Sequence, residues 1–314
     1  MIVKRRLKPS RILAYTWREL LLVGVVSIAV CALRIERGEV LVALPFGPLG
    51  VLGTALAILL GFRNNTGYAR WWEARTIWGQ IASGCRALAR QLAASLDSAA
   101  KIGKGGGAEA LAAFKRELLY RLIAFPHALR LQLRRQDGDW DQLAALLPAA
   151  DLARVRAAVN KPSAVLQGLA DRLKDGVREE KLGQFDPISL EPGLTALQAA
   201  QAGCERIKGT PMLRQYEYFA RWFLWTFLVL LPSSLLALFP ADGSRWLTIP
   251  LSLAIGFVYA ITAKTGQVTE DPFENRIHDV PMTAICNGIE RDLRDQLGEA
   301  ELPPVAEPVE GYLY

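Results

Sequence analysis

Residues 40–62 read VLVALPFGPLGVLGTALAILLGF, and residues 63–75 continue as RNNTGYARWWEAR. The first stretch is uncharged and long enough to cross a bilayer core of about 30 Å, which takes about 20 apolar residues in a helix. From Trp72 to Leu92, apolar side chains recur at steps of three and four residues, which is the spacing of an α-helix. We therefore expect one helix to leave the membrane and continue through residues 63–100.

Three further stretches have the composition of membrane spans. Residues 20–33 are uncharged and reach spanning length if the helix extends from about Tyr15 to Ile35. The other two spans carry tryptophan at or near their starts, as is typical of the membrane interface. They are Trp222–Pro240 and Trp246–Ala263. The sequence therefore predicts an all-α membrane protein with four transmembrane helices.

Lysine and arginine are distributed unevenly around these spans. The first fifteen residues contain several basic side chains and no acid, the long segment between the second and third spans is rich in arginine, and the two short links carry few basic residues. Because lysine and arginine accumulate in cytoplasmic loops, we place both termini in the cytoplasm. The expected parts are residues 1–62 with the first two spans, a helical cytoplasmic region at 63–216, the last two spans at 217–264, and a cytoplasmic C-terminal segment at 265–314.

The cytoplasmic region is expected to contain several helices and no strand. We predict a helix at about 109–135 that is interrupted at Phe125-Pro126, because proline lacks the backbone N–H that a helix interior needs. Gln184–Pro187 is expected to be a turn. The remaining predicted helices are at 151–159, 163–177 and 195–209.

Composition excludes several classes of function. The four cysteines are scattered, only two histidines occur, and the glycine-rich segment KIGKGGG at 101–107 lacks the frame of a phosphate-binding loop. The middles of the spans contain no ionisable residue, whereas pumps, transporters and intramembrane hydrolases need such residues at depth. We therefore expect no enzyme, no cofactor and no nucleic-acid partner. Two functions remain possible for the spans: a membrane anchor, or one subunit of a pore built from several copies.

The second span is the best candidate to line such a pore. Thr54, Ile58 and Phe62 repeat every four residues, so they share a helix face about 12 Å long. Around a symmetry axis they would form stacked rings, and apolar rings can gate a pore by dewetting. The alternative is that Ile58 and Phe62 only pack against another span. Arg63 and Asn64 follow and would make the inner mouth polar.

Three segments together resemble the bestrophin family. GFRNNTGYARWWEAR at 61–75 is similar to the end of the family's second span and its R-W-W continuation, DPI at 186–188 is similar to a cytoplasmic segment, and EDPFEN at 270–275 is similar to the segment after the last span. The resemblance extends from the first span to about residue 295. It implies a homopentameric channel with one axial pore in a bacterial inner membrane.

The resemblance also implies roles for individual residues. It assigns the neck of the pore to Thr54, Ile58 and Phe62, and a cytoplasmic aperture to Ile188. Thr54 departs from the aliphatic residue that is usual in the family, so we expect the outer end of the neck to be wetter.

The residues after the neck are expected to have mainly structural roles. Arg70 and Glu73 have the spacing of an i, i+3 ion pair. The resemblance places six side chains of this motif at the inner mouth or at a subunit interface. They are Arg63, Asn64, Arg70, Trp71, Trp72 and Glu73.

An acidic run after the last span helps to bind calcium in animal members of the family. This chain has only Glu270, Asp271 and Glu274 there. They are weak metal candidates, the alternative is a solvated or arginine-paired turn, and we expect no calcium gating.

The resemblance implies conduction of small monovalent ions, and two features favour chloride. The ring edge of Phe62 is electropositive, and Arg63 would add positive charge if it faced the axis. A sodium channel of the same architecture is one alternative, because some bacterial members resemble cation channels. A non-conducting anchor that binds a partner protein is the other. The expected partners are further copies of the chain, membrane lipids and the permeating ions.

Overall fold

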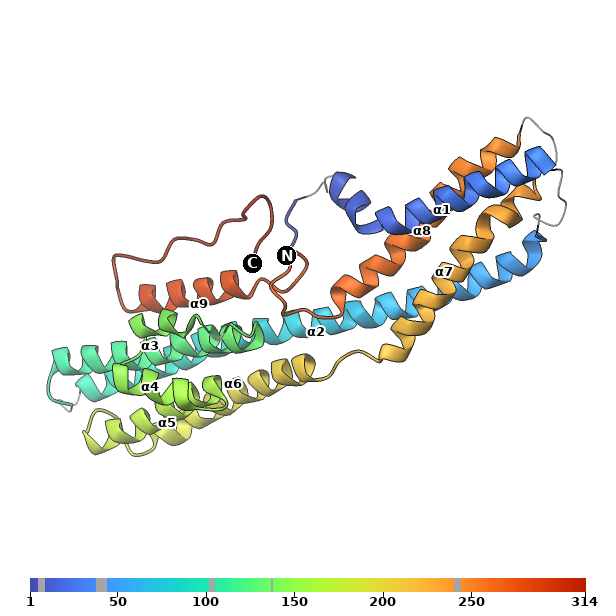
Figure 1. The fold of residues 1–314 in the computed structure, drawn as a ribbon. Helices are drawn as coiled ribbons and strands as arrows, with labels where there is room; N and C mark the ends of the chain where they lie inside the picture. Colours follow the sequence, from blue (N-terminus) through green and yellow to red (C-terminus); the bar gives the residue numbers. More distant parts are fainter. Residues whose placement is uncertain (5–8, 38–43, 102–104, 137, 240–243) are drawn as a thin grey trace. The chain divides into compact units, whose positions relative to one another are not determined.

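The structure, a computed structural model, describes residues 1–4, 9–37, 44–101, 105–136, 138–239 and 244–314. Within these ranges the chain is helical, and the only other regular pairing is two isolated bridges, of Ile2 and of Val309 with Tyr312 (Figure 1). The expected all-α class is confirmed. In chain order the helices are α1 (Pro9–Arg37), α2 (Phe46–Lys101), α3 (Ala108–Leu133), η2 (Trp140–Ala145), α4 (Ala149–Ala157), α5 (Lys161–Arg178), α6 (Asp186–Gly209), α7 (Arg214–Leu236), η3 (Arg245–Leu247), α8 (Thr248–Thr269) and α9 (Met282–Gln296).

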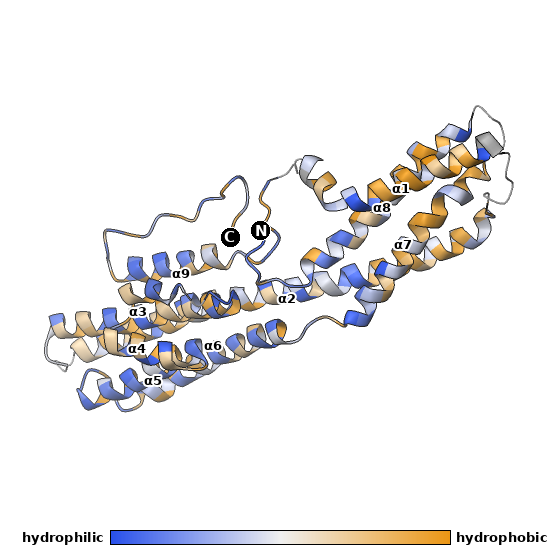
Figure 2. Ribbon diagram, viewed as in Figure 1, coloured by the Kyte–Doolittle hydropathy of each residue, from blue (hydrophilic) through white to orange (hydrophobic). Residues whose placement is uncertain are grey.

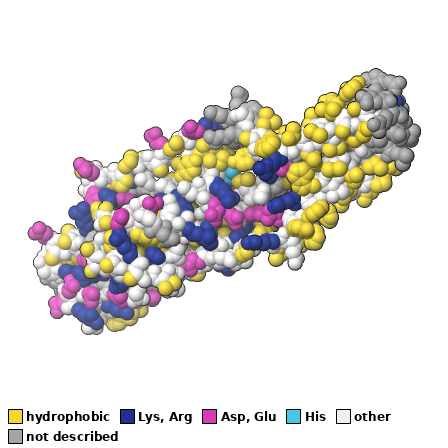
Figure 3. Space-filling view, viewed as in Figure 1, with side chains coloured by type: hydrophobic (Ala, Val, Ile, Leu, Met, Phe, Trp, Pro, Cys, Tyr) yellow, Lys and Arg dark blue, Asp and Glu magenta, His cyan; other side chains and the backbone are white. Residues whose placement is uncertain are grey.

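The chain divides into two compact units. We call the first the membrane unit (residues 4–71 and 211–270) and the second the polar unit (residues 1–3, 72–210 and 271–314). Helix α2 contributes to both. Hydrophobic residues dominate α1, α7, α8 and the start of α2 (Figure 2), while basic and acidic side chains are interspersed over the polar unit (Figure 3).

The membrane unit contains four helices that are long and apolar enough to cross a bilayer. They correspond to the four predicted spans, although α1 begins at Pro9 and α7 at Arg214, both earlier than expected, and α7 already ends at Leu236. Residue 240, the predicted end of the third span, lies outside the described residues. Residues 40–43 of the second predicted span lie outside the described residues, and its helix begins at Phe46. Leu56 and Leu60 of α2 are buried against Leu224 and Leu228 of α7.

Gly53 allows α2, α7 and α8 to approach closely. A Cβ atom at this position would lie 2.9 Å from a ring carbon of Phe227 and 3.3 Å from the hydroxyl oxygen of Tyr259. The Tyr259 hydroxyl donates a hydrogen bond to the Gly53 carbonyl at 3.1 Å. A side chain here would therefore force an aromatic ring out of its position.

Gly53→Ala is expected to destabilise the membrane unit by about 1–3 kcal/mol, the usual cost of overpacking a core. Thermal unfolding of the detergent-solubilised protein measures this change. Gly61→Ala is the matched control, because nothing lies within 4 Å of a Cβ atom at Gly61. Equal unfolding temperatures for the two variants would show that this close approach does not limit stability.

Three sequence expectations about the polar unit need correction. Helix α3 is continuous through Pro126, because its surroundings (Phe125 and Leu129 among them) are fully buried and hold the helix despite the missing N–H. The expected turn at 184–187 is shorter, since α6 already begins at Asp186 with Pro187 in its first turn, a favourable place for proline. Helix α9 was not predicted.

The proline-rich C-terminal tail has no regular structure over residues 300–308 and is bound to the same chain. The Ala284 amide of α9 donates to the Tyr314 carbonyl at 2.8 Å, and the Leu313 amide donates to the Met1 carbonyl at 2.8 Å. Asn287 donates to the Pro304 carbonyl at 2.9 Å. The tail therefore fastens α9 to the N-terminal residues, and the two termini lie side by side (Figure 1).

Candidate functional site

The three predicted neck residues share an uncovered face of α2. Ile58 is 56% exposed and Phe62 is 68% exposed, and Thr54 is exposed as well. The Thr54 hydroxyl donates to the Gly50 carbonyl at 2.9 Å, so the polar group is satisfied within its own helix. Val51 is exposed on the same face. Sequence reasoning missed Val51, although its i, i+3 and i+7 spacing to Thr54 and Ile58 was visible.

This face becomes polar but not charged just beyond Phe62. Asn65, Thr66 and Ala69 are exposed, and the Thr66 hydroxyl donates to the Phe62 carbonyl at 2.9 Å. On a face that met only lipid tails, the exposed Asn65 amide would lose its hydrogen bonds to water, which is energetically costly. The arrangement instead suits an apolar collar that opens onto water.

Arg63 lies on a different face of α2 from Phe62, and its side chain is turned into the membrane unit. Its side chain is 5% exposed, its Nε atom donates to Glu270 Oε1 at 2.7 Å, and its Nη2 atom is 2.6 Å from the same oxygen. A guanidinium buried among helices needs a carboxylate, because desolvation of an unpaired charge is costly. The charge of Arg63 is therefore neutralised inside the membrane unit.

Asn64 and Gly67 join α2 to α8. The Asn64 side chain donates to the Thr262 carbonyl at 3.0 Å. A Cβ atom at Gly67 would lie 2.7 Å from the Thr269 hydroxyl, and one at Gly266 would meet the Asn64 side chain. The motif at 63–67 is therefore largely a packing motif, in which each of these residues supports contact between two helices.

The aromatic and charged residues that follow also make structural contacts. The rings of Tyr68 and Trp71 stack with their centroids 6.3 Å apart, and Trp72 is exposed. The Glu73 carboxylate pairs with Arg206 of α6 at 2.5 Å, a partner that the i, i+3 spacing to Arg70 did not predict.

In the polar unit, the predicted aperture residue Ile188 lies exposed at the N-terminal end of α6. Ile188 is 69% exposed in the first turn of α6, and Phe185 beside it is also exposed. The Asp186 carboxylate accepts a hydrogen bond from the Gly183 amide at 2.7 Å, which fixes the start of the helix. The large apolar side chains of Phe185 and Ile188 are thus mostly exposed at the N-terminal end of α6 and are not buried by the described residues of the polar unit.

The exposed face of α2 within the polar unit is poor in charge. Thr76, Gln80, Ser83 and Ala87 are exposed, and the next exposed residue on this face is Arg90. On this face, small hydroxyl, amide and methyl groups therefore precede one basic residue, Arg90.

The weak metal candidates make ion pairs where contacts are described. Glu270 pairs with Arg63, and Glu274 pairs with Lys208 of α6, while Asp271 is exposed. Among the described residues, no group of three or more histidine, cysteine, aspartate or glutamate side chains has a geometry that could hold a metal. The ion pairs account for Glu270 and Glu274 as structural acids.

Comparison with known proteins gives a consistent result. Residues 4–295 match the family model described as Bacterial/Fungal Bestrophin protein. The voltage-dependent anion channel-forming protein YneE of Escherichia coli K12 is 35% identical over 256 residues, which is 82% of this chain and 78% of the relative. A voltage-dependent anion channel-forming protein of Ralstonia nicotianae is 32% identical over 90% of this chain and 87% of its own length. The crystal structure of a bacterial Bestrophin homolog from Klebsiella pneumoniae superposes with a TM-score of 0.78 at 28% identity, covering 90% of this chain and 98% of that one.

Proposed function

This chain belongs to the bacterial and fungal bestrophin family, and from that membership we propose that it forms a membrane channel for small anions such as chloride. The observation that carries the proposal is the uncovered face of α2, where Ile58 and Phe62 are more than half exposed between Thr54 and Asn65. An apolar collar between polar groups is what a hydrophobic gate requires. Relatives at 30% identity and above are named anion channel-forming proteins.

The collar becomes a pore only when several copies meet. A homopentamer with one axis would convert the Ile58 and Phe62 side chains of each copy into rings, because closed cyclic symmetry repeats the same surface around the axis. The same symmetry would bring five Ile188 side chains together as a second constriction. In this arrangement the exposed Ile58, Phe62 and Ile188 side chains would all line the same pore.

Conduction then depends on hydration. An ion in a ring of aliphatic and aromatic groups loses water ligands and gains few contacts in return, so the collar opposes ion entry until it is wetted. The ring edges of Phe62 are electropositive and would favour an anion at this point. Thr54 offers a hydroxyl oxygen at the other end of the collar.

The buried ion pair of Arg63 changes the basis for anion preference. Its charge is compensated by Glu270, so it gives the collar no net charge. The preference we propose comes from Phe62 and from the α2 face that carries Thr76, Gln80, Ser83, Ala87 and Arg90, which are exposed and include no carboxylate. An anion would therefore meet neutral polar groups and one positive charge per copy.

A reversal potential tests the proposal. With purified protein in a planar bilayer under a NaCl gradient, the current is expected to reverse near the chloride equilibrium potential, because chloride carries it. Reversal near the sodium value would instead identify a cation channel of the same architecture. The absence of any current from protein that elutes as an oligomer would favour a non-conducting anchor that binds a partner.

We place the channel in a bacterial inner membrane with both termini in the cytoplasm. The support is the excess of lysine and arginine before α1 and between α2 and α7, since such residues are retained on the cytoplasmic side.

A further inference from the structure

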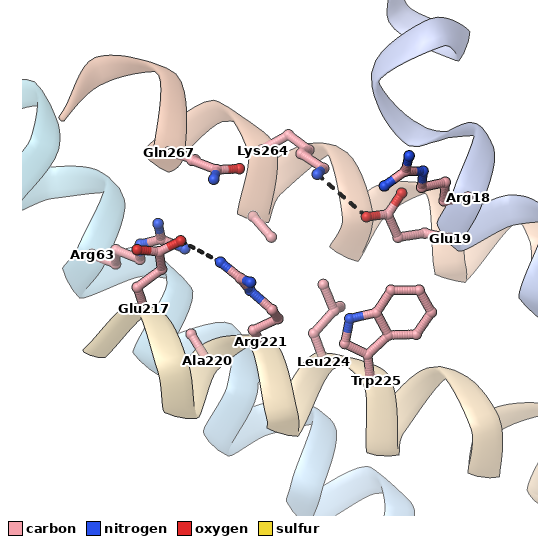
Figure 4. A pocket seen from close by; sticks show the side chains of 11 residues that line it. Arg18, Glu19, Arg63, Glu217, Ala220, Arg221, Leu224, Trp225, Lys264 and Gln267 are labelled. Atoms are coloured by element: carbon pink, nitrogen blue, oxygen red, sulfur yellow. Dashed lines mark hydrogen bonds and ion pairs between the residues drawn. The ribbon is translucent and has the colours of Figure 1, made fainter. Parts of the chain in front are cut away.

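A cavity of about 330 Å³ lies inside the membrane unit, lined by residues of α1, α2, α7 and α8 (Figure 4). Its wall carries four basic side chains, Arg18, Arg63, Arg221 and Lys264, together with Trp225. Arg18, Arg221 and Lys264 come from the first part of α1 and α7 and the last part of α8, and Arg63 comes from α2 where it leaves the predicted span. The distribution of lysine and arginine places this end of the spans at the cytoplasmic surface. None of them belongs to the α2 face that carries Ile58 and Phe62.

The basic side chains outnumber their acidic partners. Arg63, Arg221 and Lys264 each have a carboxylate partner, and four cations with three carboxylates leave one positive charge. The pairs are Arg63 with Glu270, Arg221 with Glu217, and Lys264 with Glu19, the last at 3.4 Å. Arg18 supplies the excess charge. Its guanidinium lies 5.4 Å above the Trp17 ring, and among the described residues it has no carboxylate partner.

Glu19 is a second, independent sign that the cavity holds a ligand, because one of its carboxylate oxygens lacks a hydrogen-bond donor among the described residues. Its side chain is 8% exposed, yet its Oε2 atom accepts no hydrogen bond within the described part of the chain. A buried carboxylate oxygen needs a donor. Figure 4 shows Arg18 and Glu19 together at the same side of the cavity, beside Lys264. The cavity therefore offers a place for one negative charge and, next to it, for one hydrogen-bond donor.

We propose that this cavity binds the headgroup of a glycerophospholipid, with the phosphate against Arg18 and an ammonium or hydroxyl group of the headgroup donating to Glu19. A phosphodiester carries one negative charge, which matches the excess charge of the cavity. Phosphatidylethanolamine offers N–H donors and phosphatidylglycerol offers O–H donors. Basic pockets between transmembrane helices at the cytoplasmic side bind the phosphate groups of anionic lipids in other membrane proteins.

The surroundings favour a lipid over a free phosphate ion. Leu21 of α1 and Trp222 of α7 are more than half exposed close in sequence to the lining residues, and they offer apolar surface for acyl chains. A free phosphate ion would satisfy Arg18 but would bring no chain to this surface. The shared chemistry is a phosphate group, and the experiment separates its two sources.

Native mass spectrometry of the purified protein tests the proposal with phosphatidylglycerol, phosphatidylethanolamine and phosphatidylcholine that have the same acyl chains. We expect retention of the first two and at least about fivefold weaker retention of phosphatidylcholine, whose headgroup has no N–H or O–H donor. Equal retention of all three by the wild-type protein would overturn the proposal. This arm needs no variant to fold.

Two variants assign the contacts. Arg18→Gln is expected to weaken phosphatidylglycerol binding about fivefold, the effect of one basic residue on an anionic lipid. Glu19→Gln is expected to shift the preference from phosphatidylethanolamine towards phosphatidylglycerol, because an ammonium group gains most from a carboxylate. Arg178→Gln is the matched control, since Arg178 is an exposed arginine of the polar unit. Unchanged lipid binding in Arg18→Gln, or the same loss in the control, would contradict the proposal.

Inorganic phosphate separates the two sources. At millimolar concentration it is expected to leave the thermal stability of the wild-type protein unchanged, whereas phosphatidylglycerol is expected to raise it. If phosphate alone raised the stability and Arg18→Gln abolished that effect, the cavity would be a site for a free anion and the lipid assignment would be wrong. The test does not depend on conduction, so a failure here leaves the proposed channel untouched.

Discussion

Replacing Ile58 and Phe62 together by alanine is expected to raise chloride flux through reconstituted protein about tenfold, which corresponds to about 1.4 kcal/mol off the barrier. Both side chains are more than half exposed on one face of α2. If they form the collar of the pore, their truncation widens it and reduces the energy needed to wet it. Chloride efflux from liposomes, compared at equal amounts of incorporated protein, measures the change.

The control for this experiment uses the same two residue types on other helices. Ile28 of α1 is 54% exposed and Phe219 of α7 is 52% exposed, so Ile28→Ala with Phe219→Ala removes the same groups from comparably exposed positions. This control is expected to leave the flux unchanged. An equal rise in both double variants would indicate a general leak, and no rise in Ile58→Ala with Phe62→Ala would mean that these side chains meet lipid or another span.

Periodicity was enough to predict the helices that carry the site. Uncharged runs located the spans, and the steps of three and four residues after Trp72 predicted that α2 continues far beyond them, as it does. The same periodicity was available for α9, where Met282, Cys286, Ile289 and Leu293 are buried on one face. The signal for α9 is therefore present in the sequence, although this helix was not predicted.

The orientation of Arg63 shows what the sequence could not give. Arg63 is adjacent to Phe62 in the chain, but one residue turns an α-helix by about 100°, so the two side chains point in different directions. Which of them faces the interior depends on Glu270, which lies far away in the sequence and approaches only in the folded unit. The same is true of Glu73, whose partner Arg206 comes from α6.

Continuity of α3 through Pro126 has a comparable origin. Local chemistry predicts an interruption, because proline removes one backbone hydrogen bond. The helix persists because the flanking side chains Ile123, Phe125 and Leu129 are fully buried, and their burial favours one continuous rod. The Cys286 thiol also donates a hydrogen bond to the Pro126 carbonyl at 3.3 Å, which joins this part of α3 to α9.

Glu270→Gln is expected to cause the largest loss of stability among these variants, about 3–5 kcal/mol, which is the usual cost of breaking a buried ion pair by removing one partner. The neutral amide would leave the Arg63 guanidinium buried without a counter-charge, and the Arg63 side chain is only 5% exposed. Chemical or thermal unfolding of the detergent-solubilised protein measures the loss. Asp271→Asn is the matched control, since it is the same acid-to-amide change on the next residue, which is exposed.

The double variant Arg63→Gln with Glu270→Gln separates charge from packing. If the cost of Glu270→Gln comes from an uncompensated charge, removing that charge as well should restore most of the stability, and the two substitutions will be strongly non-additive. If the double variant is as unstable as the sum of the single variants, the pair contributes through shape and hydrogen bonding. Equal stability of Glu270→Gln and Asp271→Asn would contradict the buried pair itself, and Arg63 would then be free to face the conduction path, which would return a basic residue to the mouth of the pore.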